Sequence, residues 1–223
     1  EQTAAGARAL ALGLSALADV NDVSAYHWNP AGLAGLSGTE VLLDLAKPYG
    51  IADLDEGTVA FGTSRFGTGW ALAWHHLGIG GAYGEELISL AAGRRLWTFP
   101  GGHALSGGAT FKYGRVGFQP FTDPSTGRSL DYGSQAKGSF DTGILWSTPW
   151  KVDVTWVMRD LLEPRYELVL GSGGDQLVAR HELAAAFRWN RESTVTGSWA
   201  QVDGGRTSIN LGMEVLFYDV FAI

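Results

Sequence analysis

The stretch KVDVTWVMR, residues 151–159, decides the fold, because its side chains change character at every step. In an extended chain successive side chains point to opposite faces. One face therefore receives the apolar Val152, Val154, Trp156 and Met158. The other receives Lys151, Asp153, Thr155 and Arg159. This period of two predicts a β-strand with one apolar and one polar face.

The same alternation continues in other segments. Leu183, Ala185, Phe187 and Trp189 alternate with Glu182, Arg188 and Asn190, and Ile209, Leu211, Met213, Val215 and Phe217 alternate with Asn210 and Glu214. From Thr39 onward, apolar and aromatic segments are separated by Gly, Pro, Asp or Ser clusters, which is typical of strands and turns. We predict strands near 39–48, 56–66, 68–78, 84–95, 103–115, 136–147, 150–159, 165–171, 178–190, 192–203 and 206–218.

These strands are long enough to cross a membrane, since about nine to eleven tilted residues span a bilayer. Small or polar residues, Ser106, Gly108, Thr110 and Lys112, alternate with Leu105, Ala109, Phe111 and Tyr113, as expected for a polar lumen and a lipid-facing surface. In hydrocarbon only a closed barrel satisfies every strand's backbone. We therefore expect an all-β, closed antiparallel transmembrane barrel in the bacterial outer membrane, in contact with its lipid. A soluble β-sandwich that binds ligands on a Trp-rich face remains the alternative.

Aromatic residues and one long connection fit this barrel. Six aromatic side chains near strand ends suit interfacial girdles: Trp97, Phe99, Trp146, Trp150, Trp189 and Phe217. The longest polar connection, Gln119 to Gln135, is expected to be an extracellular loop. Residues 66–84 contain no Asp, Glu, Lys or Arg, but six glycines predict strands and turns there rather than a transmembrane helix.

Composition excludes several classes of protein. The chain has 223 residues, 45% of them hydrophobic and 17% charged, which argues against disorder. A net charge of −7 without basic runs argues against nucleic acid as a partner. With no cysteine, disulfides and thiolate metal sites are absent. The start Glu1-Gln2-Thr3 is not a secretory signal, so we expect any signal peptide to have been removed already.

The sequence offers no convincing catalytic or cofactor site. His75 and His76 are adjacent, so in a strand they face opposite sides and cannot chelate one ion together. No Gly-x-Ser-x-Gly elbow precedes a helix. Asp141, Asp153 and Glu214 are expected to be lumen charges rather than acid–base catalysts. We expect no enzyme activity, no metal and no cofactor.

Residues 1–38 differ from the strand repeat. Ala4 to Ala18 is rich in Ala and Leu and predicts a short buried helix. Trp28, Asn29, Pro30, Ala31 and Gly32 then form a turn, because a proline disfavours helical geometry in the residue before it. The segment is either a capping helix or a hatch that fills the lumen, with Trp28–Gly32 along a substrate path. We divide the chain into a hatch, 1–38, and a barrel, 39–223.

Several stretches resemble a known family. Gly6-Ala-Arg-Ala-Leu10, Asp19, Asp22 and Ala25-Tyr-His-Trp-Asn-Pro-Ala-Gly-Leu-Ala34 are similar to the N-terminus of PorV/PorQ-type outer-membrane proteins, which belong with the FadL-like long-chain fatty acid transporters. Gly84-Glu85-Glu86, Gly107 to Tyr113, Phe140-Asp141-Thr142-Gly143 and Gly212-Met213-Glu214 resemble strands of these barrels. The resemblance implies fourteen strands and a hatch. Because ten or eleven are predicted here and single-chain barrels have an even number, we expect either about three further strands at the C-terminus or a smaller barrel.

The resemblance implies two functions. The first is an accessory or docking barrel for protein export, as in PorV-like proteins, with a secretion translocon or a secreted protein as partner. The alternative is a FadL-like transporter for a hydrophobic small molecule. An apolar lumen pocket near Asn29 would favour transport, whereas a charged lumen without such a pocket would favour docking.

Overall fold

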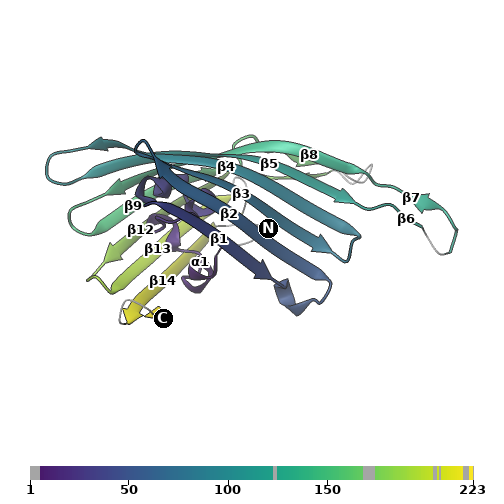
Figure 1. Ribbon diagram of the computed structural model, residues 1–223, viewed down its shortest axis with the longest axis horizontal. Coiled ribbons are helices and arrows are strands. Elements are labelled where there is room, and N and C mark those ends of the chain that lie inside the picture. Colours follow the sequence, from purple (N-terminus) through teal and green to yellow (C-terminus); the bar gives the residue numbers. More distant parts are fainter. Residues whose placement is uncertain are drawn as a thin grey trace.

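The computed structural model describes residues 6–122, 125–167, 174–202, 205, 207–217 and 221–222. One antiparallel sheet dominates it (Figure 1), and its strands follow the order of the chain. They are β1 (Thr39–Ala46), β2 (Leu54–Arg65), β3 (Thr68–Ile79), β4 (Tyr83–Thr98), β5 (Ala104–Phe118), β8 (Ser134–Ser147), β9 (Val152–Arg159), β12 (Arg180–Arg188), β13 (Ser193–Val202), β14 (Thr207–Phe217) and the short β15 (Phe221–Ala222).

Two short hairpins lie outside this sheet. They are formed by β6 (Phe121–Thr122) with β7 (Ser129–Leu130), and by β10 (Arg165–Tyr166) with β11 (Asp175–Gln176). Figure 1 shows that the β6–β7 hairpin, which belongs to the predicted loop 119–135, extends far from the rest of the sheet.

The predicted strand 165–171 is therefore wrong as a member of the sheet. Its described part forms only β10, and residues 168–173 lie outside the described residues. The physical reason is that Arg165 and Tyr166 pair with β11 in a separate hairpin, while β9 pairs directly with β12 in the sheet.

The helical elements are short and gather at the N-terminal end. They are α1 (Ala7–Ala11), η1 (Ala16–Ala18), α2 (Ala25–Trp28), η2 (Pro30–Gly35) and, after β1, η3 (Pro48–Gly50). The helix predicted over 4–18 is broken because Gly13 and Leu14 adopt left-handed φ values of 61° and 66°. Ala4 and Ala5 lie outside the described residues. In the part of the chain that the structure describes, no helix has the length and apolarity needed to cross a membrane.

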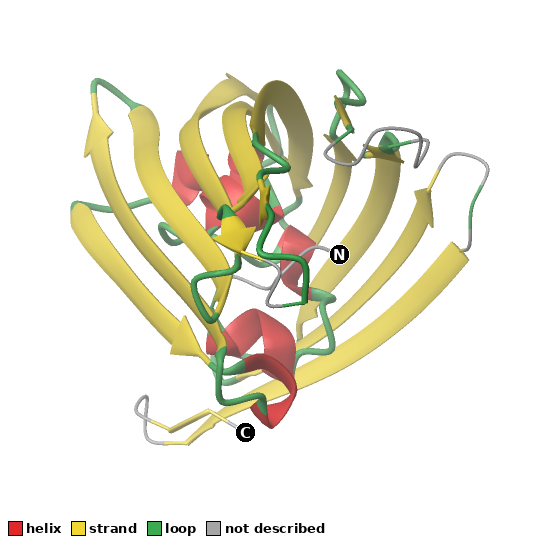
Figure 2. Ribbon diagram, turned by 90° about the vertical axis from the view of Figure 1, so that its right-hand side faces the viewer, coloured by secondary structure: helices red, strands yellow, loops and turns green. Residues whose placement is uncertain are grey.

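The sheet curls around the N-terminal segment, residues 6–38, which lies on its concave side (Figure 2). Buried side chains of this segment, such as Val23 and Leu33, pack in one cluster with small residues of the strands, such as Ala60 and Ala73. Because the inward side chains are small, the segment approaches the strand backbones closely.

The two faces of the strands are confirmed. On β5, Thr110 is 1% exposed and faces inward, whereas its neighbour Phe111 is 49% exposed and faces outward. On β9 the inward Thr155 is 1% exposed and the outward Trp156 is 42% exposed. The outer surface is therefore apolar and aromatic, and the inner surface is polar or small, as the alternation predicts.

The expected closure of the barrel is not observed. Among the described residues β1 pairs only with β2, and β14 pairs only with β13 and β15. Both margins instead contact the N-terminal segment: the Gly6 backbone N–H donates to Asp44 of β1 over 2.9 Å, and Arg8 donates to Glu214 of β14 over 2.7 Å. The described chain thus forms an open, curled sheet with ten long strands, and the implied fourteen strands stay a prediction.

The two ends of the sheet differ. At the short-turn end, the hairpin connections are residues 66–67, 99–103, 148–151 and 189–192. At the long-loop end, they include 47–53, 119–133 and 160–179. All six aromatic residues assigned to girdles belong to strand ends or turns at the short-turn end, so the sequence assignment of these residues to two opposite ends is wrong. The side chain of Phe217 lies outside the described residues.

Candidate functional site

The predicted turn Trp28–Gly32 lies deep inside the curled sheet, and all five of its residues are buried. Asn29 holds it in place. Its side-chain NH₂ group donates to the Leu17 carbonyl and to Thr155 Oγ1 of β9, each over 2.9 Å, and its Oδ1 accepts from the Ala31 N–H over 3.1 Å. Pro30 follows as the first residue of η2, where its fixed φ suits the start of a helix.

A row of glycines forms the surface against which this turn packs. Gly69, Gly93, Gly108 and Gly143 are paired in register on β3, β4, β5 and β8, and we call them the glycine row. A Cβ atom on Gly93 or Gly108 would lie 2.2 Å from backbone atoms of Pro30, and one on Gly143 would lie 2.3 Å from Asn29 Oδ1. Only glycine permits this approach of backbone to backbone.

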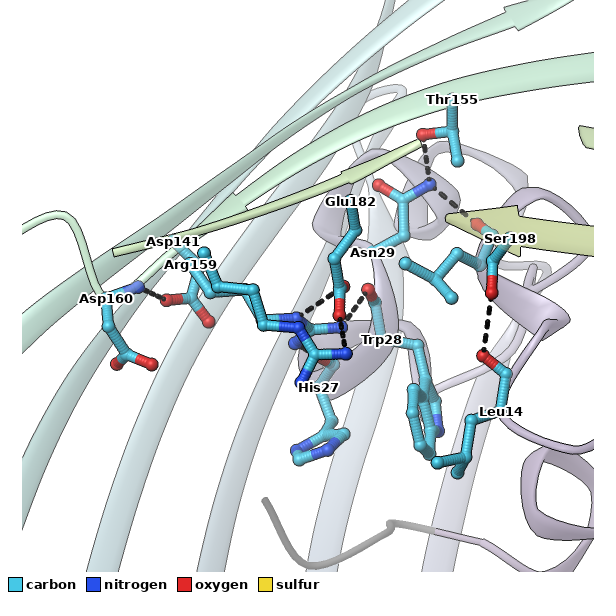
Figure 3. Close-up of polar contacts among 12 residues, drawn as sticks. Leu14, His27, Trp28, Asn29, Asp141, Thr155, Arg159, Asp160, Glu182 and Ser198 are labelled. Carbon is cyan, nitrogen blue, oxygen red and sulfur yellow. Dashed lines mark hydrogen bonds and ion pairs between the residues drawn. The ribbon is translucent and has the colours of Figure 1, made fainter. Parts of the chain in front are cut away.

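Arg159 clamps the same segment from β9. Its Nε donates to Glu182 of β12 over 2.7 Å, its Nη2 donates to the Trp28 carbonyl over 2.7 Å, and its Nη1 donates to the His27 carbonyl. Figure 3 shows the guanidinium group between the Glu182 carboxylate and these carbonyls. Arg159 is 2% exposed, so the C-terminal carbonyls of α2, which have no helical partner, are satisfied by a buried cation.

Lys112 forms a second ion cluster beside this clamp. Its Nζ lies 2.7 Å from Asp141 Oδ1 and 2.5 Å from Asp160 Oδ1. The Asp160 N–H also donates to Asp141 over 2.8 Å. The lysine is thus shared by two carboxylates, one on the neighbouring strand β8 and one just after β9.

A third network ties the beginning of the segment to β12 and β14. Asp19 accepts from Arg8 over 2.6 Å and from Arg188 over 2.7 Å. Arg8 also pairs with Glu214, and Arg188 with Asp153, each over 2.7 Å. The lumen acids therefore have partners in two of these networks, Asp141 in the second and Asp153 and Glu214 in the third, which gives each of them a structural role.

A cavity of about 960 Å³ lies between the segment and the long-loop end of the sheet. We call it the lumen cavity. Tyr26 and His27 contribute to it from the segment, and Leu87, Val116 and Phe118 contribute from β4 and β5. The charged groups Lys112, Asp141, Arg159 and Asp160 also line it. Along β5, the inward positions run from Gly108 under Pro30, through Lys112 at the floor, to Val116 and Phe118 toward the long-loop end. The upper part of the cavity is mixed in character, because Glu85, which is paired in register with Val116, also lines it, as do Glu86, Lys137 and Asp175.

His27 stands at this floor with its imidazole neutral. Burial, together with the positive charges of Arg159 and Lys112, lowers the pKa of His27 well below its ordinary value. Protonation there would place a third positive charge beside two others.

The histidine pair lies as predicted. His75 Nδ1 is 2.9 Å from Thr58 Oγ1 on the inner face, whereas His76 stacks on the outward Trp74 with ring centroids 5.8 Å apart. Within the described ranges no three His, Cys, Asp or Glu residues gather as metal ligands.

Sequence reasoning found the turn and the lumen acids but missed the glycine row and the clamp. Each glycine of the row occupies an inward strand position, and glycine inside a strand often marks a close approach of another backbone. That signal was present. No signal in the sequence pairs Arg159 with the carbonyl of Trp28, which is 131 residues away along the chain.

Comparisons with known proteins agree with this architecture at the level of the fold. No protein-family model matches the chain, and no curated protein matches it. A solved structure, the crystal structure of a Pseudomonas aeruginosa FadL homologue, is similar, with a TM-score of 0.54 and 12% sequence identity over 96% of this chain and 76% of that chain. The chain therefore shares the FadL-like fold, which in the described residues is an open, all-β antiparallel sheet of eleven strands with little helix.

Proposed function

We propose that the chain is a non-enzymatic outer-membrane barrel that transports hydrophobic small molecules. The observation that carries this proposal is the lumen cavity, in which Leu87, Val116 and Phe118 provide apolar and aromatic surface above a floor built from the N-terminal segment. The fold shared with a FadL homologue supports it. In this proposal the long loops face outside, the apolar surface contacts lipid, and residues Trp28–Gly32 act as a hatch across the path.

The experiment is uptake of a radiolabelled hydrophobic solute by Gram-negative cells that lack their own carrier and express this chain. Pro30→Ala should reduce uptake, because Pro30 fixes the turn that packs on the glycine row. Pro120→Ala is the matched control, because Pro120 lies in the exposed connection 119–133. Unchanged uptake in Pro30→Ala would count against the hatch role of the turn, and no uptake by cells with the unaltered chain would refute the transport function.

The second candidate is the docking barrel for protein export that the PorV-like resemblance implies. The charged floor favours it, since Lys112, Asp141, Arg159 and Asp160 give the lumen the wet, ionic character expected of that role. Pull-down from solubilised outer membranes should then recover a translocon or a secreted protein. Repeated recovery of the chain by itself would argue against this candidate.

A further inference from the structure

Two polar atoms at the floor of the lumen cavity are buried without a hydrogen-bond partner among the described residues. They are Ser139 Oγ on β8 and His27 Nε2 on the N-terminal segment. Of the five side-chain atoms in this condition, only these two belong to residues that line the cavity. Buried polar groups are nearly always hydrogen-bonded, so each exception calls for a partner such as a ligand or a water molecule. Ser139 is 4% exposed, and its hydroxyl therefore has little access to bulk solvent.

The charged groups around these two atoms already have partners. Lys112 is held by Asp141 and Asp160, and Arg159 by Glu182 and two carbonyl groups. The carboxylate of a fatty acid would have to break one of these ion pairs to reach a cation at the floor, and breaking a buried pair is costly. The third cation lining the cavity, Lys137, is exposed and lies on the row of Gly114, closer to the long-loop end.

His27 offers a neutral hydrogen-bonding group at the same level. Its lowered pKa keeps the ring uncharged at neutral pH, so one ring nitrogen donates and the other accepts. The Ser139 hydroxyl both donates and accepts. Together they suit an uncharged oxygen rather than an anion.

The wall above the floor has an apolar and aromatic part, and Glu85, Glu86 and Asp175 line the cavity beside it. Leu87, Val116 and Phe118 form the apolar part, together with Tyr83, whose ring centroid is 5.0 Å from that of Phe118. The volume of about 960 Å³ lies at the upper end of the range of about 300–1,000 Å³ common for ligand sites. A chain-like molecule with one polar end fits this cavity, with its alkyl part along the apolar side chains.

We infer that the lumen cavity binds an amphiphile with an uncharged oxygen head group, such as a long-chain alcohol or ketone, through Ser139 and His27, in preference to an ionised fatty acid. This inference rests on the proposed transport function, because it names the substrate class of the same cavity. The alkyl chain lies along Leu87, Val116 and Phe118, and the head group reaches the floor.

Equilibrium binding tests this preference directly. The chain in phospholipid nanodiscs is titrated at pH 8 with radiolabelled 1-dodecanol, with dodecanoate, which is ionised at that pH, and with dodecane, and binding to empty nanodiscs is subtracted. We expect dodecanol to bind at least about tenfold more tightly than dodecanoate, which corresponds to about 1.4 kcal/mol.

Two variants locate the head group. Ser139→Ala should weaken dodecanol binding roughly fivefold, the effect of one neutral hydrogen bond, and leave dodecane binding unchanged. His27→Leu should weaken dodecanol binding similarly and strengthen dodecane binding. Ser147→Ala is the matched control, because Ser147 lies on the same strand but outside the cavity lining.

The outcomes separate this inference from the function on which it rests. Equal or tighter binding of dodecanoate would overturn the head-group preference while leaving transport supported. If neither variant changes dodecanol binding, ordered water satisfies Ser139 Oγ and His27 Nε2, and the proposed head-group site is wrong. If none of the three probes binds and cells take up no solute, the transport function itself fails.

Discussion

Arg159 connects the N-terminal segment to the sheet at the centre of the interior. It is buried, and it joins a strand of the sheet to the carbonyls of His27 and Trp28 and to Glu182. A buried ion pair adds little to the free energy of unfolding compared with an apolar pair in its place. Removing only one partner is costly, because the other charge then stays buried with less compensation. Its importance is therefore tested by comparing single and double substitutions.

We predict that Arg159→Met lowers the free energy of unfolding by about 3 kcal/mol, since the buried carbonyls of His27 and Trp28 lose their donor and Glu182 loses one of its two charged partners. The double variant Arg159→Met/Glu182→Leu should recover part of this loss. Arg165→Met, an exposed arginine of β10, should change stability by no more than about 0.5 kcal/mol. Denaturant unfolding in detergent, followed by tryptophan fluorescence, measures all three, and equal effects at positions 159 and 165 would contradict the clamp.

His27 gives the interior a dependence on pH. Its pKa is lowered in the folded state, so above the ordinary value of 6.5 the imidazole is neutral in both states. Below pH 6.5 the unfolded chain binds a proton that the folded chain does not, and the free energy of unfolding falls as the pH falls.

Thermal unfolding at pH 7.5 and pH 5.5 checks this sign. On acidification, the free energy of unfolding should fall more in the unaltered chain than in His27→Gln. The extra loss is about 1.4 kcal/mol for each pH unit below 6.5 over which His27 stays neutral in the folded state. A smaller loss in the unaltered chain than in the variant would show that His27 is protonated in the fold.

Among the elements, the glycine row and the N-terminal segment define each other's position. Four strands contribute one glycine each, and the segment lays the backbone of residues 29–33 across them. The outward residues of these strands can be replaced by other residues. The inward glycines cannot, because atoms of the N-terminal segment already occupy the space that a Cβ atom would need.

Gly108→Ala should therefore lower the stability by about 1–3 kcal/mol, the usual cost of overpacking. Gly138→Ala is the matched control on β8, since a Cβ atom there would meet the Phe111 ring at an ordinary 3.5 Å. Midpoints of denaturant unfolding compare the two. A Gly108→Ala variant as stable as the control would mean that the segment does not lie against the sheet.

The segment is also fixed near β13, where Ser15 Oγ lies 2.5 Å from Thr196 Oγ1. The chain contains no cysteine, so a designed pair is free of competing thiols. Ser15→Cys/Thr196→Cys should form a disulfide on mild oxidation, whereas Ser15→Cys/Thr207→Cys, with an exposed partner on β14, should not. Mass spectrometry of peptides detects the bond, and cross-linking of the second pair instead of the first would contradict the segment's placement.

The elements differ in how far the sequence predicts them. Alternation places the long strands and their two faces, because a one-residue shift would move Trp156 inside and Thr155 outside. It misplaces the segment 165–171. Tyr166 there pairs with β11 in a separate hairpin, and its hydroxyl donates to the Gly114 carbonyl. The helix predicted over 4–18 fails at Gly13–Leu14, where the chain must turn toward β13 and β14.

The candidate site follows the same division. Trp28–Gly32 is visible in the sequence because a proline after Asn29 marks a rigid turn. Its partners are not visible, because Thr155, Arg159 and the glycine row reach it only after the sheet has curled. The polarity of the lumen cavity also depends on that curl, which brings Lys112 of β5 beside Asp160 at the end of β9.

At the scale of the whole molecule, the curled sheet separates two environments. Many outward side chains of the described strands are exposed and apolar, among them Trp70, Leu72, Trp74, Phe111, Trp156 and Leu211. A large exposed apolar surface marks contact with a membrane or another protein. The inward side chains meet the N-terminal segment, three ion networks and the lumen cavity. A single sheet with this outer surface differs from a sandwich, in which such side chains pack between two layers.

The central claim is that this outer surface contacts acyl chains. Two variants that each retain a single tryptophan test it: one keeps Trp156, which is 42% exposed on the outer face, and the other keeps Trp28, which is 5% exposed under the turn. In vesicles of phospholipid brominated along the acyl chain, we predict strong quenching of Trp156 fluorescence and little quenching of Trp28. Unquenched Trp156, in a chain that stays folded and monomeric in buffer without detergent, would contradict the claim.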